Sequence, residues 1–123
     1  MYSESDGPAK SPIKLEEIQR IEKTQLSSSE KHYLRVLAHC LASFKLMANA
    51  SNNNFLPNNS TRLKWLLKES GYKEDDAFLN LLLDQLEVAG KKLENLAEFY
   101  QISPLELTLD HLINSLELES RKT

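Results

Sequence analysis

The sequence predicts an all-α protein, an irregular bundle of four main helices plus a short N-terminal amphipathic helix. Leucine dominates the apolar residues, with 23 Leu against 5 Ile and 2 Val. Leucine loses little side-chain freedom in a helix, whereas β-branched residues favour strands. Only 3 Gly and 4 Pro are available for turns. A chain of 123 residues with this composition supports one domain with one core, expected over residues 26–118.

The beginning of the chain is expected to be the least ordered part. Residues 1–11 are mostly small, polar or charged and are predicted to be disordered. An amphipathic helix is predicted over residues 12–25, because Leu15, Ile18 and Ile21 recur at a spacing of three. A helix this short is marginal alone in water. It therefore either docks on the domain or stays free for a partner.

The second helix is predicted to start near residue 28, after the capping box of Ser27 and Glu30. One arc of this helix is apolar, and the opposite face carries polar side chains. The apolar arc contains Tyr33, Leu34, Val36, Leu37, Cys40, Leu41, Phe44 and Met47, and the polar face His32, Arg35, His39 and Ser43. An Asn-rich loop over residues 49–61 then leads into a third helix that is expected to stop at Gly71.

The fourth helix is capped by Asp75 or Asp76 and runs to Tyr100. Its main apolar face stays in phase across Gly90, which favours one long helix, with a break near Gly90 as the alternative. A second apolar line consists of Leu81, Val88 and Phe99. A helix that is apolar on two sides is either central in its domain or shared with a partner, which includes a second copy of the chain.

The fifth helix has the strongest local start signal, the tetrapeptide Ser103-Pro104-Leu105-Glu106. It combines a Ser cap, Pro at the first helical position and Glu at the third. The helix is predicted to run from Pro104 and to fray over residues 119–123.

Residues 93–114 also match a degenerate helix-turn-helix motif, with Gln101 at the turn position where Gly is frequent. The segment from Pro104 to Asn114 would be the reading helix, but it contains Glu106 and Asp110 and no Lys or Arg. Base and phosphate contacts depend heavily on basic side chains. An ordinary corner between two packed helices is therefore the preferred interpretation.

Trp65 stands out because on a helical wheel it lies opposite the leucines of the third helix, among Arg62, Lys64 and Lys68. An exposed Trp beside basic groups suits a protein interface, and it also suits nucleic acid through phosphate contacts and base stacking. Burial under the N-terminal helix or the Asn-rich loop is the third interpretation. The sequence predicts partner binding through these four residues together with Leu81, Val88 and Phe99.

The charge distribution keeps a nucleic-acid alternative open. Residues 28–71 contain six Lys or Arg and two acids, whereas residues 72–123 contain five Lys or Arg and eleven acids. The basic segment 28–68, with His32, Arg35 and His39 as possible phosphate contacts, is the only part that would attract a polyanion. The net charge of −3 counts against this alternative.

Catalysis, a metal site and a cofactor are not expected. Cys40 lies in the apolar arc, and its sequence neighbour His39 points about 100° away on a helix. The chain has no His-Glu-x-x-His, Cys-x-x-Cys, Gly-x-Gly-x-x-Gly or phosphate-loop motif. The lack of a leader-like or membrane-spanning apolar run predicts a cytoplasmic protein. The sequence thus predicts a non-catalytic interaction protein, an adaptor or regulatory subunit that binds another protein, with homodimerisation and nucleic acid as alternatives and no membrane partner.

Overall fold

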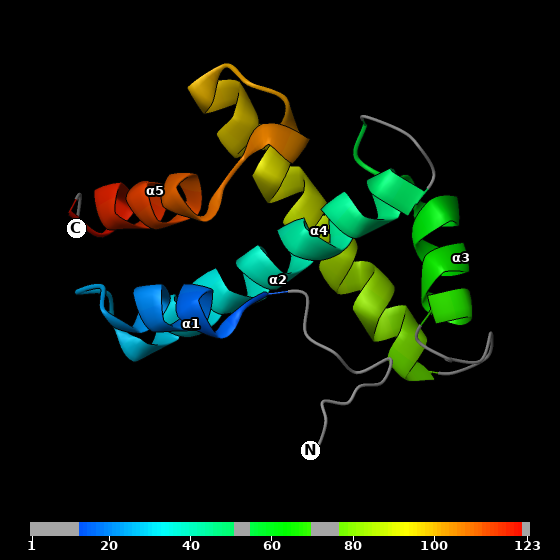
Figure 1. Ribbon diagram of the computed structural model, residues 1–123, viewed down its shortest axis with the longest axis horizontal. Helices are drawn as coiled ribbons and strands as arrows, with labels where there is room; N and C mark the ends of the chain where they lie inside the picture. The colour runs from blue at the N-terminus through cyan, green and yellow to red at the C-terminus, as the bar shows by residue number, and fades with distance from the viewer. Residues whose placement is uncertain (1–12, 51–54, 70–76, 122–123) are drawn as a thin grey trace.

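The computed structural model describes residues 13–50, 55–69 and 77–121, and every regular element in these ranges is helical (Figure 1). The elements are α1 (Leu15–Glu22), α2 (Ser28–Ala50), α3 (Asn59–Glu69), α4 (Ala77–Tyr100), the short 3-10 helix η1 (Pro104–Glu106) and α5 (Leu109–Arg121). The predicted all-α fold is confirmed. The predicted disorder at residues 1–11, the stop at Gly71 and the cap at Asp75 or Asp76 lie outside the described residues.

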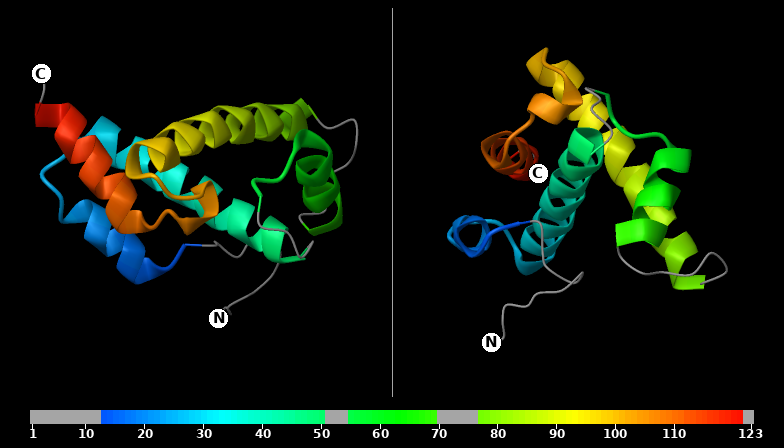
Figure 2. Two further views of the ribbon diagram at one scale, coloured as in Figure 1. Left: turned by 90° about the horizontal axis from the view of Figure 1, so that it is seen from above. Right: turned by 45° about the vertical axis from the view of Figure 1, so that its right-hand side comes forward.

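Helix α2 is the central element, and it packs against α1, α3, α4, η1 and α5. Helix α4 crosses it, α3 lies at one end of the molecule, and α1 and α5 lie together at the other end (Figures 1 and 2). The core forms where these helices meet, because their apolar stripes face inward. Leu15 of α1, which is 70% exposed, is an exception. The largest fully buried side chains of the core are Phe44, Ile21, Leu34, Met47, Leu79, Leu93, Leu107 and Leu112.

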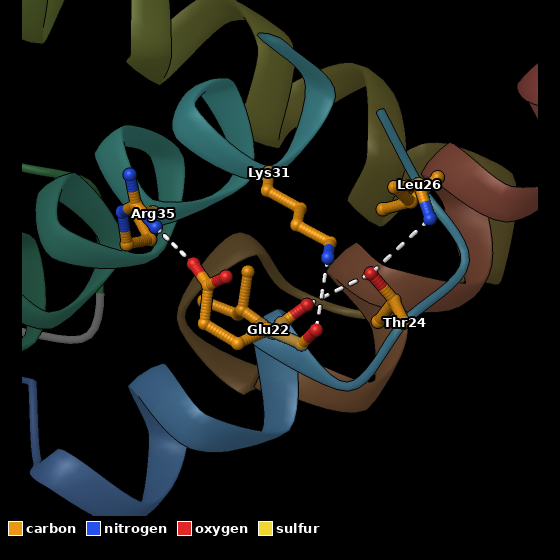
Figure 3. A network of polar contacts seen from close by, with 6 residues as sticks. Glu22, Thr24, Leu26, Lys31 and Arg35 are labelled. Carbon is orange, nitrogen blue, oxygen red and sulfur yellow. Dashed lines mark hydrogen bonds and ion pairs between the residues drawn. The ribbon is translucent and has the colours of Figure 1, made fainter. Parts of the chain in front are cut away.

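Helix α1 is docked, which settles the question that the sequence left open. Ile21 is completely buried. Glu22 forms an ion pair with Arg35, and its backbone carbonyl accepts a hydrogen bond from Lys31 Nζ at 2.9 Å (Figure 3). At the other side of α1, Arg20 forms an ion pair with Asp110 of α5. The helix is thus held by one buried apolar contact and by polar contacts to two other helices.

Helix α4 is continuous across Gly90, as the phase of its apolar residues predicts. Gly90 is buried, and a Cβ atom at this position would lie 3.1 Å from Nη2 of Arg62 and 3.8 Å from the ring of Phe44. The absence of a side chain thus lets α2 and α3 approach α4 closely. The alternative of a break at this glycine is wrong.

The predicted single helix from Pro104 is wrong. The Ser103–Glu106 capping box forms, with Ser103 N–H donating to Glu106 Oε1 at 2.8 Å, but it starts only the three-residue η1. Leu107 then adopts an extended backbone with ψ 146° and is fully buried, and its carbonyl accepts a hydrogen bond from Lys45 Nζ of α2 at 2.7 Å. Burial of Leu107 against α2 outweighs the local preference for a continued helix.

Helix α5 starts instead after Thr108, whose N–H donates to His111 Nδ1 at 2.9 Å. This helix continues to Arg121, beyond the predicted onset of fraying at residue 119.

The end of α4 forms a Schellman motif in which Gln101 takes the position that is usually glycine. Ile102 N–H donates to the carbonyl of Ala97 at 3.0 Å, and Gln101 N–H donates to that of Glu98 at 3.1 Å. This pattern places Gln101 in the left-handed region, with φ 59°. Glycine normally occupies that position because a side chain is disfavoured there.

Replacing this glutamine with glycine should therefore stabilise the protein. We expect Gln101→Gly to raise the free energy of unfolding by about 1 kcal/mol, since the strain removed exceeds the added chain entropy of Gly. Gln101→Ala is the matched control, because alanine keeps the same strain, and it should leave stability nearly unchanged. Urea denaturation followed by circular dichroism measures both. Equal stability of the Gly and Ala variants would contradict the argument.

Candidate functional site: the α2–α4 groove

An apolar groove of about 400 Å³ runs between α2 and α4. We call it the α2–α4 groove, and it is lined by His32, Tyr33, Val36, Leu37, Gln85, Val88 and Ala89. The side chains come from successive turns of the two crossing helices, and Val88 is 67% exposed. Large apolar side chains left open to water in a concave surface are typical of interaction sites.

The second apolar line of α4 lies on the surface. Leu81, Val88 and Phe99 are 65%, 67% and 68% exposed, whereas Leu79, Leu86 and Leu93 of the main face are buried. Leu81 lies seven residues before Val88, so it extends the groove side of the helix by two turns. Phe99 makes an edge contact with Tyr100, with ring centres 5.1 Å apart. The interpretation that this line is central in the domain is wrong.

The groove has a polar end, a hollow of about 240 Å³ that shares His32, Val36 and Gln85 with it. His39 and Cys40 also line this hollow, although they point from different sides of α2. Partial desolvation lowers the pKa of His39, and burial raises the pKa of the Cys40 thiol to about 11. The reactive thiolate is therefore scarce at neutral pH, and the geometry gives no activated Cys–His pair.

The polar face of α2 is only partly available for phosphate. His32 and His39 are exposed, but Arg35 also lines the hollow and is paired with Glu22 of α1. The sequence could not show this pairing, because it depends on how α1 docks. The three residues predicted as nucleic-acid contacts thus lie together. Arg35, the one whose charge is permanent, is already neutralised by Glu22.

The predicted cluster around Trp65 is divided by the fold. Lys64 and Lys68 are exposed, and Trp65 is partly buried against the core. Arg62 was expected on the same polar face, but its side chain is only 8% exposed and is paired with Glu87. This expectation is wrong because α4 and Phe44 cover that side of α3. Whether the remaining residues bind a partner stays a prediction.

The acids of the supposed reading helix have structural partners. Glu106 caps the N–H of Ser103, and Asp110 is paired with Arg20. The extended Leu107 also interrupts the second helix of the proposed helix-turn-helix motif. The segment from Pro104 to Asn114 is therefore not the continuous helix that the motif requires.

Sequence analysis missed part of the groove. Tyr33 and Val36 were placed in the core arc of α2, and Gln85 was not singled out. Tyr33 is 40% exposed, and Val36 is half-buried. Val36 lies at the edge of the apolar arc, which is the signal that would have drawn attention to it. Tyr33 lies near the middle of the arc, so the helical wheel gives no such signal for it.

Within the described ranges, His, Cys, Asp and Glu side chains nowhere gather in threes that would hold a metal ion. Among the helices of the same ranges, none has the length and apolar character to cross a bilayer.

Comparison with known proteins gives one family. The family model described as NDH complex assembly factor CRR9 matches residues 13–123, which is most of the chain. No curated protein and no solved structure matches. The matched range starts where the described structure starts and includes all five α-helices. The chain belongs to the family of NDH complex assembly factor CRR9.

Proposed function

We propose that this protein is a non-catalytic assembly factor that holds a protein subunit of the NDH complex in the α2–α4 groove. The family membership supports the assembly role and the partner complex. The observation that carries the choice of surface is Val88, an apolar residue that lines the groove and is 67% exposed. Covering it and its neighbours with a partner removes apolar surface from water, worth about 25 cal/mol per Å².

The shape and polarity of the groove favour an amphipathic segment of the subunit. Apolar side chains of such a segment would fill the part of the groove formed by Val36, Val88 and Ala89. Polar groups of the same segment would meet His32 and His39 at the polar end. Interfaces with an apolar centre and a polar edge are the common arrangement for specific binding.

A single charge in the groove tests the proposal. We expect Val88→Asp to lower the recovery of NDH subunits with the tagged protein at least tenfold, because the carboxylate would lose its hydration when the partner covers it. Recovery is measured by quantitative mass spectrometry after affinity purification from the native organism.

Two controls make the result specific. Val88→Ile keeps the apolar surface, and Leu15→Asp places the same charge on a 70% exposed residue of α1, outside the groove. Both should recover the subunits as the wild-type chain does, and circular dichroism should show that all variants are folded. Undiminished recovery with Val88→Asp would remove the groove from the interface.

The same variant separates a partner subunit from a second copy of the chain. If the wild-type protein sediments as a dimer and Val88→Asp sediments as a monomer, the groove serves homodimerisation. The nucleic-acid alternative receives less support, since Arg62 and Arg35 both form ion pairs within the fold. The cytoplasmic location stays a prediction.

A further inference from the structure

The face of α4 that borders the α2–α4 groove repeats with the heptad spacing of a coiled coil. We call this face the α4 seam, and it consists of Leu81, Gln85, Val88, Lys92, Asn95 and Phe99, spaced alternately by four and three residues. Such a spacing is typical of a helix that packs lengthwise against another helix. Apart from the partly buried Lys92, all six side chains are exposed, so no helix of the described ranges covers the seam.

The two sides of the α4 seam differ in chemistry. The inner side, which faces the core, carries Leu82, Ala89 and Leu96. The outer side carries an exposed charge in each of three successive heptads, Asp84, Lys91 and Glu98, so the sign alternates. Charges beside a coiled-coil seam are the groups that select the partner helix and set its register.

The outer charges are available to a partner. Asp84 and Glu98 form no ion pair within the described ranges. Lys91 is 74% exposed, and its Nζ lies 3.9 Å from Glu87, whose carboxylate already accepts a hydrogen bond from Arg62 at 2.8 Å. An exposed pair at that distance contributes little, so it does not hold Lys91 in place.

The cations closer to the groove, in contrast, have partners within the fold. Arg35 is paired with Glu22 of α1, and Lys92 of the seam itself is paired with Glu119 of α5 at 3.2 Å. The alternating outer charges are therefore the main ionic groups that a helix docking on α4 would meet.

Building on the function proposed above, we propose that the occupant of the α2–α4 groove is an α-helix of the partner subunit that lies along the α4 seam. It carries a basic, an acidic and a basic side chain in three successive heptads, which meet Asp84, Lys91 and Glu98. The seam from Leu81 to Phe99 is about 27 Å long, so the occupant needs about five helical turns. The alternation reads the same from both ends and therefore fixes the register of the occupant.

The same charges disfavour a second copy of the chain as the occupant. An antiparallel pair of α4 helices covers the exposed apolar residues when Leu81 packs against Phe99 of the second copy. In that register, Asp84 faces Glu98 of the second copy, and the two Lys91 side chains face each other. In a parallel pair, the two Lys92 side chains would meet. Like charges beside a seam are a common device against a wrong partner.

Synthetic helices of three heptads test the charge pattern. The first peptide has leucine at the seam positions and Lys, Glu and Lys beside the seam in successive heptads. The control peptide has the order Lys, Lys, Glu, so its composition and net charge are the same. We expect the first peptide to bind the full chain at least fivefold more tightly at low salt, and the difference should shrink at high salt.

Binding is followed by backbone amide shifts of Gln85 and Val88, below the concentration at which each peptide self-associates. Equal affinity for the two peptides would overturn the proposed charge pattern. Absence of binding, or binding that Val88→Asp does not weaken, would overturn the helix as occupant. A wild-type chain that sediments as a dimer and is not dissociated by the first peptide would show that a second copy takes its place.

Reversing the outer charges should reverse the preference. The triple variant Asp84→Lys/Lys91→Glu/Glu98→Lys should bind the first peptide at least tenfold more weakly and should prefer a peptide with the order Glu, Lys, Glu. Glu94→Lys is the matched control, because it reverses an exposed charge of α4 far from the seam and should leave the preference unchanged. A triple variant that keeps the wild-type preference would contradict the proposal.

Recovery of NDH subunits with the tagged chain separates this proposal from the groove itself. We expect Asp84→Lys to lower the recovery at least threefold and Glu94→Lys to leave it unchanged. If Val88→Asp loses the subunits and Asp84→Lys retains them, the groove is the docking site and the charge pattern is wrong. If Val88→Asp retains the subunits, the groove proposal fails, and this one fails with it.

Discussion

Replacing Phe44 with alanine is expected to lower the free energy of unfolding by about 3–5 kcal/mol. The ring is completely buried and lies where α2 meets α3 and α4. Its removal leaves a cavity and also takes away the aromatic face that lies 5.1 Å from the guanidinium of Arg62. Chemical denaturation monitored by circular dichroism measures the change.

Phe44→Leu is the matched variant, because it keeps most of the apolar volume and removes only the ring face. Its cost should be clearly smaller than that of Phe44→Ala, since volume-conserving changes are tolerated best. A cost below about 1 kcal/mol for Phe44→Ala would show that the three helices do not depend on this contact.

Ile21→Ala is the second change with a large expected effect, a loss of about 2–5 kcal/mol that falls mainly on the docking of α1. Ile21 is fully buried, and α1 has only eight residues, so the helix is marginal once its anchor is lost. The ion pairs of Arg20 and Glu22 are exposed and contribute little by themselves. Hydrogen exchange should therefore become faster in α1 before it changes in α4.

Leu15→Ala is the control on the same helix, because Leu15 is 70% exposed. It should change stability by no more than about 0.5 kcal/mol. Equal effects of Leu15→Ala and Ile21→Ala would mean that docking does not depend on the buried side chain. Unchanged exchange of α1 in Ile21→Ala would mean that the ion pairs hold the helix.

The long helices could be predicted because their pattern repeats over many turns. The phase of α4 across Gly90 outweighs the local cost of one glycine. The same pattern did not decide whether Leu81, Val88 and Phe99 are central in the domain or exposed, and the structure shows them exposed. The break at Leu107 could not be predicted in this way. It depends on Lys45, which is 62 residues away in the sequence and donates to the Leu107 carbonyl.

The candidate sites could be predicted only in part, for the same physical reason. A helical wheel places Arg62, Lys64 and Lys68 around Trp65, but it cannot show that Gly90 leaves room for the guanidinium of Arg62. Val88 was predicted to bind a partner, with a central position in the domain as the alternative, whereas Tyr33 was assigned to the core. The exposure of Tyr33 depends on where α2 and α4 cross, which is a tertiary property.

The ion pair between Arg20 and Asp110 joins residues 90 positions apart, and α5 also packs on α2. During synthesis on the ribosome, α1 and α2 therefore emerge long before the helix that covers them. Until Leu112 leaves the exit tunnel, the apolar face of α2 that packs on α5 stays open to water. Transiently exposed apolar surface of this kind makes an incompletely folded chain prone to aggregation. Because α5 follows α2 in the chain, this face of α2 is covered only after α5 has been synthesised.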